Sequence, residues 1–108
     1  MHVETQTREF SLTSGLQEFL RRRIEFALGR YKDAVRRVTV RLRDLNGPRG
    51  GADKQCQLQV ELSGQPPLVI SDTDPDLYVA IGRAAKRADR QVARRLGRKP
   101  KRLTLTEA

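Results

Sequence analysis

Residues 76–98 distribute apolar and cationic side chains to opposite sides of one predicted α-helix. At about 100° per residue, seven apolar side chains fall on one face, namely Leu77, Ile81, Ala84, Ala85, Ala88, Val92 and Leu96. Six cations gather roughly opposite, namely Arg83, Lys86, Arg87, Arg90, Arg94 and Arg98. The rest of the chain must therefore cover one face of this helix and leave the other in contact with solvent.

Local signals mark both ends of this helix. Asp74 is expected to cap its first N–H groups, with Pro75 at the first helical position and Asp76 complementing the positive helix end. Gly97 and Pro100 are stop signals. Arg95 does not fit the pattern, because it projects near the apolar face and must either lie on a frayed last turn or extend its charge to solvent.

The charge of the chain is concentrated in and after this helix. The formal net charge is +9 over 108 residues, and ten of the 22 Lys and Arg residues lie within residues 76–102. Such a local excess predicts a polyanionic partner, either nucleic acid or an anionic membrane. The length predicts one domain, residues 1–100, with a short flexible tail at residues 101–108. No apolar run reaches the roughly 18 residues of a spanning helix and no signal peptide is evident, so we expect a cytoplasmic protein.

The remaining elements follow from hydrophobic periodicity. A strand is expected at residues 2–10, a helix at 15–31 and strands at 37–43, 55–62 and 68–71. Thr13, or Ser14 in a capping box with Gln17, begins the first helix. The glycine-rich stretch 46–51 is interpreted as a hairpin loop, since it lacks the GxxxxGK[ST] pattern of a phosphate loop and no helix follows it.

The element order βαβββα predicts an α+β fold. Both helices offer an apolar face, and three successive strands favour a mainly antiparallel sheet with one face buried. We therefore expect a two-layer sandwich with two helices on one face of the sheet. Arg37, Arg41 and Arg43 should line the exposed sheet face together with glutamines.

The sequence offers little for catalysis. His2 is the only histidine and Cys56 the only cysteine, so no catalytic triad or zinc site can be assembled, and Cys56 is expected to be a buried apolar residue. The acidic residues between 72 and 76 are interpreted as helix caps rather than metal ligands. No aromatic residue lies on the three clearest strands, which argues against base stacking on the sheet. We expect a protein without enzymatic activity, cofactor or small-molecule substrate that contacts phosphates and RNA shape.

Several motifs resemble those of the ribosome hibernation-promoting factor and RaiA-type ribosome-associated inhibitor family, also called sigma-54 modulation proteins. They are Leu12-Thr13, Leu16-Gln17-Glu18-Phe19, Asp76-Leu77-Tyr78-Val79-Ala80-Ile81 and Arg90-Gln91. The resemblance covers nearly the whole chain. It implies a fold like the double-stranded-RNA-binding domain, in a short family member without the C-terminal domain by which long members pair ribosomes.

The resemblance also implies a function. A member of this family binds the small ribosomal subunit in the channel used by messenger and transfer RNA and blocks translation when growth stops. The residues implied as contacts to ribosomal RNA are the six helix cations Arg83, Lys86, Arg87, Arg90, Arg94 and Arg98, with Arg22 and Arg23 of the first helix. We expect a monomer. The alternatives are a general double-stranded nucleic-acid binder of the same fold and a module whose basic face docks on an acidic protein or an anionic membrane.

Overall fold

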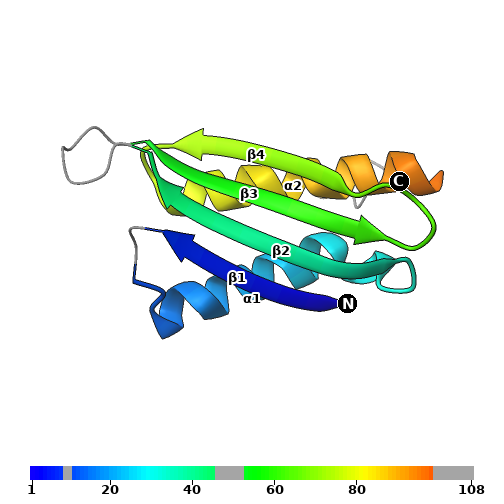
Figure 1. The fold of residues 1–108 in the computed structure, drawn as a ribbon, viewed down its shortest axis with the longest axis horizontal. Coiled ribbons are helices and arrows are strands. Elements are labelled where there is room, and N and C mark those ends of the chain that lie inside the picture. The colour runs from blue at the N-terminus through cyan, green and yellow to red at the C-terminus, as the bar shows by residue number, and fades with distance from the viewer. Residues whose placement is uncertain (9–10, 46–52, 99–108) are drawn as a thin grey trace, which may run out of the picture.

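A four-stranded sheet and two helices form two layers in the computed structural model, which describes residues 1–8, 11–45 and 53–98. The elements follow the order β1 (His2–Arg8), α1 (Ser14–Leu28), a 3-10 turn η1 (Gly29–Tyr31), β2 (Val35–Asp44), β3 (Lys54–Leu62), β4 (Leu68–Asp74) and α2 (Leu77–Leu96). Figure 1 shows both helices behind one face of the sheet. The predicted α+β sandwich is confirmed. The expected 46–51 loop and the 101–108 tail lie outside the described residues.

The sheet is mixed, with spatial order β1-β2-β3-β4. Strand β1 runs parallel to β2, whereas β2, β3 and β4 are antiparallel neighbours. Helix α1 connects the two parallel strands, as such a crossover requires. The antiparallel meander was expected from the sequence, but periodicity alone could not assign β1 its direction or its neighbour.

The core lies between the sheet and the helices. Alternation along the strands sends Val38, Val40 and Leu42 of β2 inward, and they are at most 1% exposed. The apolar face of α2 packs on β3 and β4 and on α1. Its four central alanines, Ala80, Ala84, Ala85 and Ala88, are fully buried. Small side chains at a contact let a helix approach its neighbour closely.

Several element boundaries differ from the prediction. Helix α1 ends at Leu28 before the 3-10 turn, β2 begins at Val35, and the junction of β4 and α2 differs most. Strand β4 extends to Asp74, beyond the expected end at residue 71, because its last residues pair with Lys54, Gln55 and Cys56 of β3. Asp74 therefore ends a strand, and the cap of α2 is Asp76, whose side chain accepts a hydrogen bond from the Tyr78 N–H at 2.9 Å. The expectation that Asp74 caps the helix was wrong. Its carboxylate accepts from the Asp76 N–H instead.

The other helix ends agree with the sequence signals. Gly97 ends α2 in the left-handed conformation, with φ of 70°, which glycine adopts without a steric penalty. Thr13 caps α1 by accepting a hydrogen bond from the Leu16 N–H at 3.1 Å. Of the two caps that the sequence allowed, the structure uses Thr13.

One buried polar contact joins the end of the first helical segment to α2. The Tyr31 hydroxyl donates to the Asp89 carboxylate at 2.6 Å, and both residues are buried. Burial and the neighbouring Asp89 carboxylate raise the pKa of Tyr31, so its hydroxyl stays protonated and remains a donor. This contact anchors the basic helix to the preceding part of the chain.

Tyr31→Phe should destabilise the fold by about 1–3 kcal/mol, because the buried Asp89 carboxylate loses a donor that water cannot replace. Tyr78→Phe is the matched control, since Tyr78 is 48% exposed, and its free energy of unfolding should change by less than about 0.5 kcal/mol. Urea titrations of both variants measure the difference. If both variants lost the same free energy of unfolding, the hydrogen bond from Tyr31 to Asp89 would not stabilise the fold specifically.

Candidate nucleic-acid interface

Three cations form a continuous exposed stripe along the outer face of α2. Lys86, Arg90 and Arg94 follow one another at intervals of four residues and are all exposed, so they lie on the same side of the helix. Within the described parts of the chain, none of the three has an ion pair or a side-chain hydrogen bond. We call these residues the outer stripe. Its charges are available to an anionic partner without loss of an internal contact.

Three other arginines of α2 turn toward the free edge of the sheet. Arg87 donates to the backbone oxygen of Ser71 at 2.6 Å, and Arg83 donates to that of Thr73 at 2.8 Å. Arg95 donates to the backbone oxygen of Pro66 at 2.8 Å. We call these three the edge arginines. They donate to carbonyl groups along and just before β4, an outer strand of the sheet. The contact with Pro66 explains why Arg95 departs from the helical charge pattern.

Asp72 holds two of the edge arginines in place. Its carboxylate pairs with Arg83 at 2.8 Å and with Arg87 at 3.4 Å, and Asp74 adds a contact to Arg83 at 3.2 Å. Partial burial would raise the pKa of Asp72, but hydrogen bonds and charge from Arg83 and Arg87 hold it below its ordinary value. The acidic cluster therefore orients arginines, and only Asp76 caps the helix.

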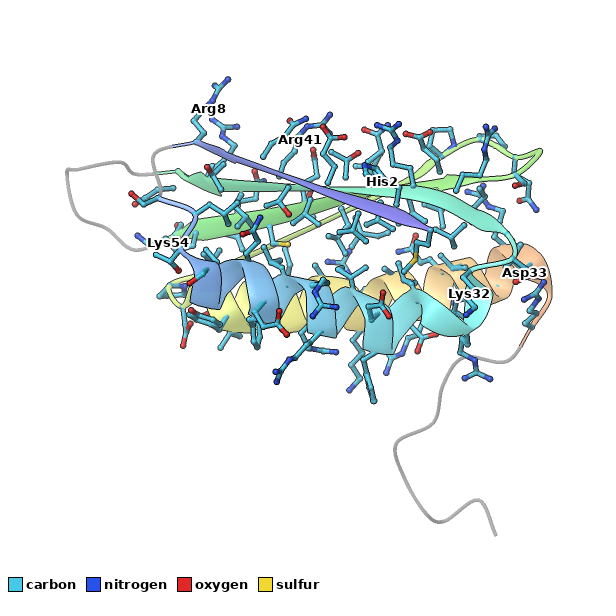
Figure 2. The ribbon with its side chains drawn as sticks, turned by 90° about the horizontal axis from the view of Figure 1, so that it is seen from below. His2, Arg8, Lys32, Asp33, Arg41 and Lys54 are labelled. Carbon is cyan, nitrogen blue, oxygen red and sulfur yellow. The ribbon has the colours of Figure 1, made fainter. Side chains whose placement is uncertain are left out.

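Arg98 is also engaged within the molecule. Its guanidinium donates to both carboxylate oxygens of Asp33, at 3.0 and 2.7 Å. The hydrogen bonds from Arg98 lower the pKa of Asp33, and the same contact raises the pKa of Arg98. This pair ties the end of α2 to the turn that follows η1. Figure 2 shows Asp33 at this end of the molecule, beside Lys32.

The two candidate arginines of α1 differ in their contacts. Arg22 is exposed and donates to Glu18 at 2.8 Å, a surface contact of the kind that stabilises a helix only slightly. Arg23 donates to the backbone oxygen of Gly82 at 3.0 Å and lies 5.9 Å from the centre of the Phe26 ring. Arg23 thus bridges the two helices, whereas Arg22 remains open to solvent.

Exposed aromatic rings lie on the helical layer, and sequence analysis did not assign them a role. Tyr78 of α2 packs edge-on against Phe19 of α1 with ring centres 4.7 Å apart. Tyr78 and Phe26 remain 48% and 47% exposed. The helical spacing of Phe19, Arg23 and Phe26 places them on one flank of α1, but only the packing of α1 on α2 shows that this flank meets Tyr78. Bases can stack on such rings.

Cys56 belongs to the buried core of the protein. Cys56 is fully buried, as expected, and burial raises the pKa of its thiol to about 12. Among the described residues, no cluster of three or more His, Cys, Asp or Glu could hold a metal ion. Neither described helix combines the length and apolar character needed to cross a membrane.

Comparison with known proteins assigns the family. The model of the family described as sigma 54 modulation protein / S30EA ribosomal protein matches residues 3–99. The chain belongs to this family. The predicted resemblance is therefore confirmed, and the chain is a member of a family of ribosome-associated proteins. No curated protein matches the chain.

Two solved structures share the fold. The N-terminal domain of Protein Y from Thermus thermophilus is 27% identical, with a TM-score of 0.73, and the match covers 87% of this chain and 98% of that one. A ribosomal subunit interface protein from Coxiella burnetii is 12% identical, with a TM-score of 0.78, over 91% of this chain and 100% of that one. At that lower identity, the second comparison supports the fold alone.

Asp72→Asn should destabilise the protein at neutral pH and have little effect in strong acid. The folded-state pKa of Asp72 lies below its ordinary value of 3.8, so the ionised carboxylate stabilises the fold above the unfolded pKa. That contribution disappears as the pH falls through the lowered folded value. Urea midpoints of the variant and the wild type should therefore differ at pH 7 and converge in strong acid, once the pH has fallen through the lowered folded-state pKa.

Glu25→Gln is the control for this pH dependence. Glu25 is exposed on α1, and its replacement removes the same charge without touching β4. Its midpoint should follow that of the wild type at both pH values. A constant difference between Asp72→Asn and the wild type across the whole range would exclude the contact of the ionised Asp72 with Arg83 and Arg87 as the stabilising interaction.

Proposed function

We propose that this protein is a translation inhibitor of the hibernation type that binds the small ribosomal subunit and obstructs the channel for messenger and transfer RNA. The supporting observation is the outer stripe of Lys86, Arg90 and Arg94 on a family member, three exposed cations without partners among the residues that the structure describes. Phosphates of ribosomal RNA are the groups that such a stripe fits. The mechanism needs no chemical step, because the bound domain excludes the other RNAs by its volume.

The charged residues contribute unequally to binding in this proposal. The outer stripe contacts phosphates directly, and Arg22 adds a contact from α1 after releasing the weak surface pair with Glu18. Arg83, Arg87 and Arg98 must first exchange a carboxylate or carbonyl partner for a phosphate, so their net contribution is smaller. Arg23 acts by holding α1 against α2. The six cations expected from the sequence thus divide into three direct contacts and three that chiefly maintain the fold.

The size of the domain suits a blocking role. The described fold has principal extents of 45, 34 and 23 Å, and the narrowest of them exceeds the roughly 12 Å width of a DNA major groove. A domain of this size, bound in a passage that other RNAs use, would exclude them sterically. Exposed Tyr78 and Phe26 beside the cations supply rings on which an unpaired base can stack.

The alternative function is general binding of double-stranded RNA. A protein with that function would use the same phosphate contacts, so its affinity for free duplex RNA would equal its affinity for ribosomal subunits at the same salt concentration. A module that docks on an acidic protein would keep its partner after RNase treatment. The proposed inhibitor should prefer intact small subunits and lose them when the RNA is digested.

Replacing the outer stripe should strongly weaken sedimentation with small ribosomal subunits and lower its dependence on salt. Lys86→Gln/Arg90→Gln/Arg94→Gln removes three charges that have no partner in the described part of the chain. Each lost phosphate contact should reduce the slope of log affinity against log salt by about one. Sucrose-gradient cosedimentation at several salt concentrations measures both effects. The variant should also lose its inhibition of translation in a purified system.

The matched control is Arg83→Gln/Arg87→Gln/Arg95→Gln, which removes the same charge from the same helix. It should bind with a slope closer to that of the wild type, although it unfolds at a lower temperature because the β4 edge loses its donors. Equal loss of binding in both triple variants would show that only net charge matters. Failure of the wild type to bind subunits at low salt would refute the proposed function.

A further inference from the structure

The outer face of the sheet has a strongly uneven distribution of charge along the strands. One end carries Glu4 of β1, opposite Thr39, and Glu61 of β3, opposite Arg37 of β2. Arg36 lines a surface depression there together with Glu61. Arg37 donates to Glu4 at 3.0 Å. Acidic and basic groups are therefore balanced at this end. This half of the face offers little attraction for an anion.

The opposite end of the same face is cationic. Arg8 of β1 stands beside Arg43 of β2 in the parallel register, and Arg41 lies two residues before Arg43. Figure 2 shows Arg8 and Arg41 directed away from the helical layer. No acidic side chain of the described strands accompanies them on this part of the face, since Asp44 lies on the inner side and pairs with Lys54. Adjacent like charges repel one another until an anion lies between them.

The cationic end is also hollowed and lined with amide groups. A depression of about 330 Å³ lies over β1, β2 and β3. The exposed-face side chains around it are Gln6, Arg8, Arg41, Arg43, Gln55 and Gln57. Arg41 is held over this depression because it donates to the amide oxygens of Gln6 and Gln59, at 3.2 and 3.1 Å. Arginines fix phosphate oxygens, and glutamine amides can bind both phosphate and sugar hydroxyls.

We infer that this depression is a second RNA-binding site, which takes the sugar-phosphate backbone of an RNA segment different from the one on the outer stripe. The inference rests on the proposed function, because that function makes RNA the polyanion that surrounds the protein. The two sites lie on opposite layers of the sandwich, so one RNA strand is not expected to occupy both without passing around the domain. The protein would then connect two segments of ribosomal RNA across its thickness. The absence of aromatic side chains from the described sheet face favours backbone contact over base stacking.

Site-specific cross-linking tests the second site directly. Cys56 is buried and its thiol has a pKa of about 12, so an introduced surface cysteine is the group that a thiol-reactive probe labels. Gln57→Cys places a photoactivatable cross-linker in the depression, and Val79→Cys places the same reagent on the exposed face of α2. Each labelled protein is bound to purified small ribosomal subunits and irradiated, and the cross-linked nucleotides are mapped.

We expect both probes to form RNA cross-links at different segments of ribosomal RNA. Cross-links from Val79→Cys alone, in a complex that still sediments normally, would refute the second site and leave the proposed function intact. Cross-links from Gln57→Cys to a ribosomal protein in place of RNA would also refute it. Absence of any complex would refute the proposed function and this inference together.

A charge-matched pair of variants measures the contribution of the second site. Arg8→Gln/Arg43→Gln should weaken subunit binding and reduce the salt slope by about two, because two phosphate contacts are lost. Arg36→Gln/Arg37→Gln removes the same charge at the balanced end of the face, beside Glu61, and should change the slope by less than one. Equal slopes in the two double variants would contradict a localised site.

Discussion

The burial of four alanines on α2 determines much of this structure. Ala80, Ala84, Ala85 and Ala88 are fully buried on the helix, which packs on β3, β4 and α1, and their small size lets the helix lie close to these neighbours. That proximity brings the long edge arginines within hydrogen-bonding distance of β4 carbonyl oxygens. Bulkier residues at the same positions would hold the helix farther from the sheet, and the guanidinium groups would not reach. The core and the charged surface of α2 are therefore a single physical arrangement.

This arrangement gives arginines of one helix two different roles. Those on the β4 flank neutralise half-buried acids and donate to backbone oxygens. Those on the outer face stay exposed, with no partner among the described residues. Composition cannot distinguish the two groups, because both consist of cations on one amphipathic helix. Their difference arises from Asp72 and Asp74, which attract one flank and leave the opposite one free. A basic helix is thus compatible with a stable fold because part of its charge is compensated inside the molecule.

Sequence reasoning recovered the element order, the two layers and the buried faces, because strong periodicity controls these features. It placed the end of β4 too early because Ser71 to Asp74 are polar, and only their pairing with β3 makes them a strand. It selected the wrong aspartate as the cap of α2 for the same reason. The positions of the outer stripe were predicted correctly as cationic. That its side chains have no partner among the described residues could not be predicted from the sequence. The contact of Asp72 with Arg83 could not be predicted either, because it depends on how α2 turns back along β4.

The edge arginines have a consequence for self-association. A sheet can grow indefinitely only if both of its outer strands accept new neighbours. On this sheet, side chains of α2 already occupy backbone oxygens of β4, whereas β1 has no comparable arginine contact among the residues that the structure describes. Two copies that paired through their β1 strands would leave only blocked edges outside. Strand addition would then stop at a closed pair, and fibre growth by this route would have no free end to extend.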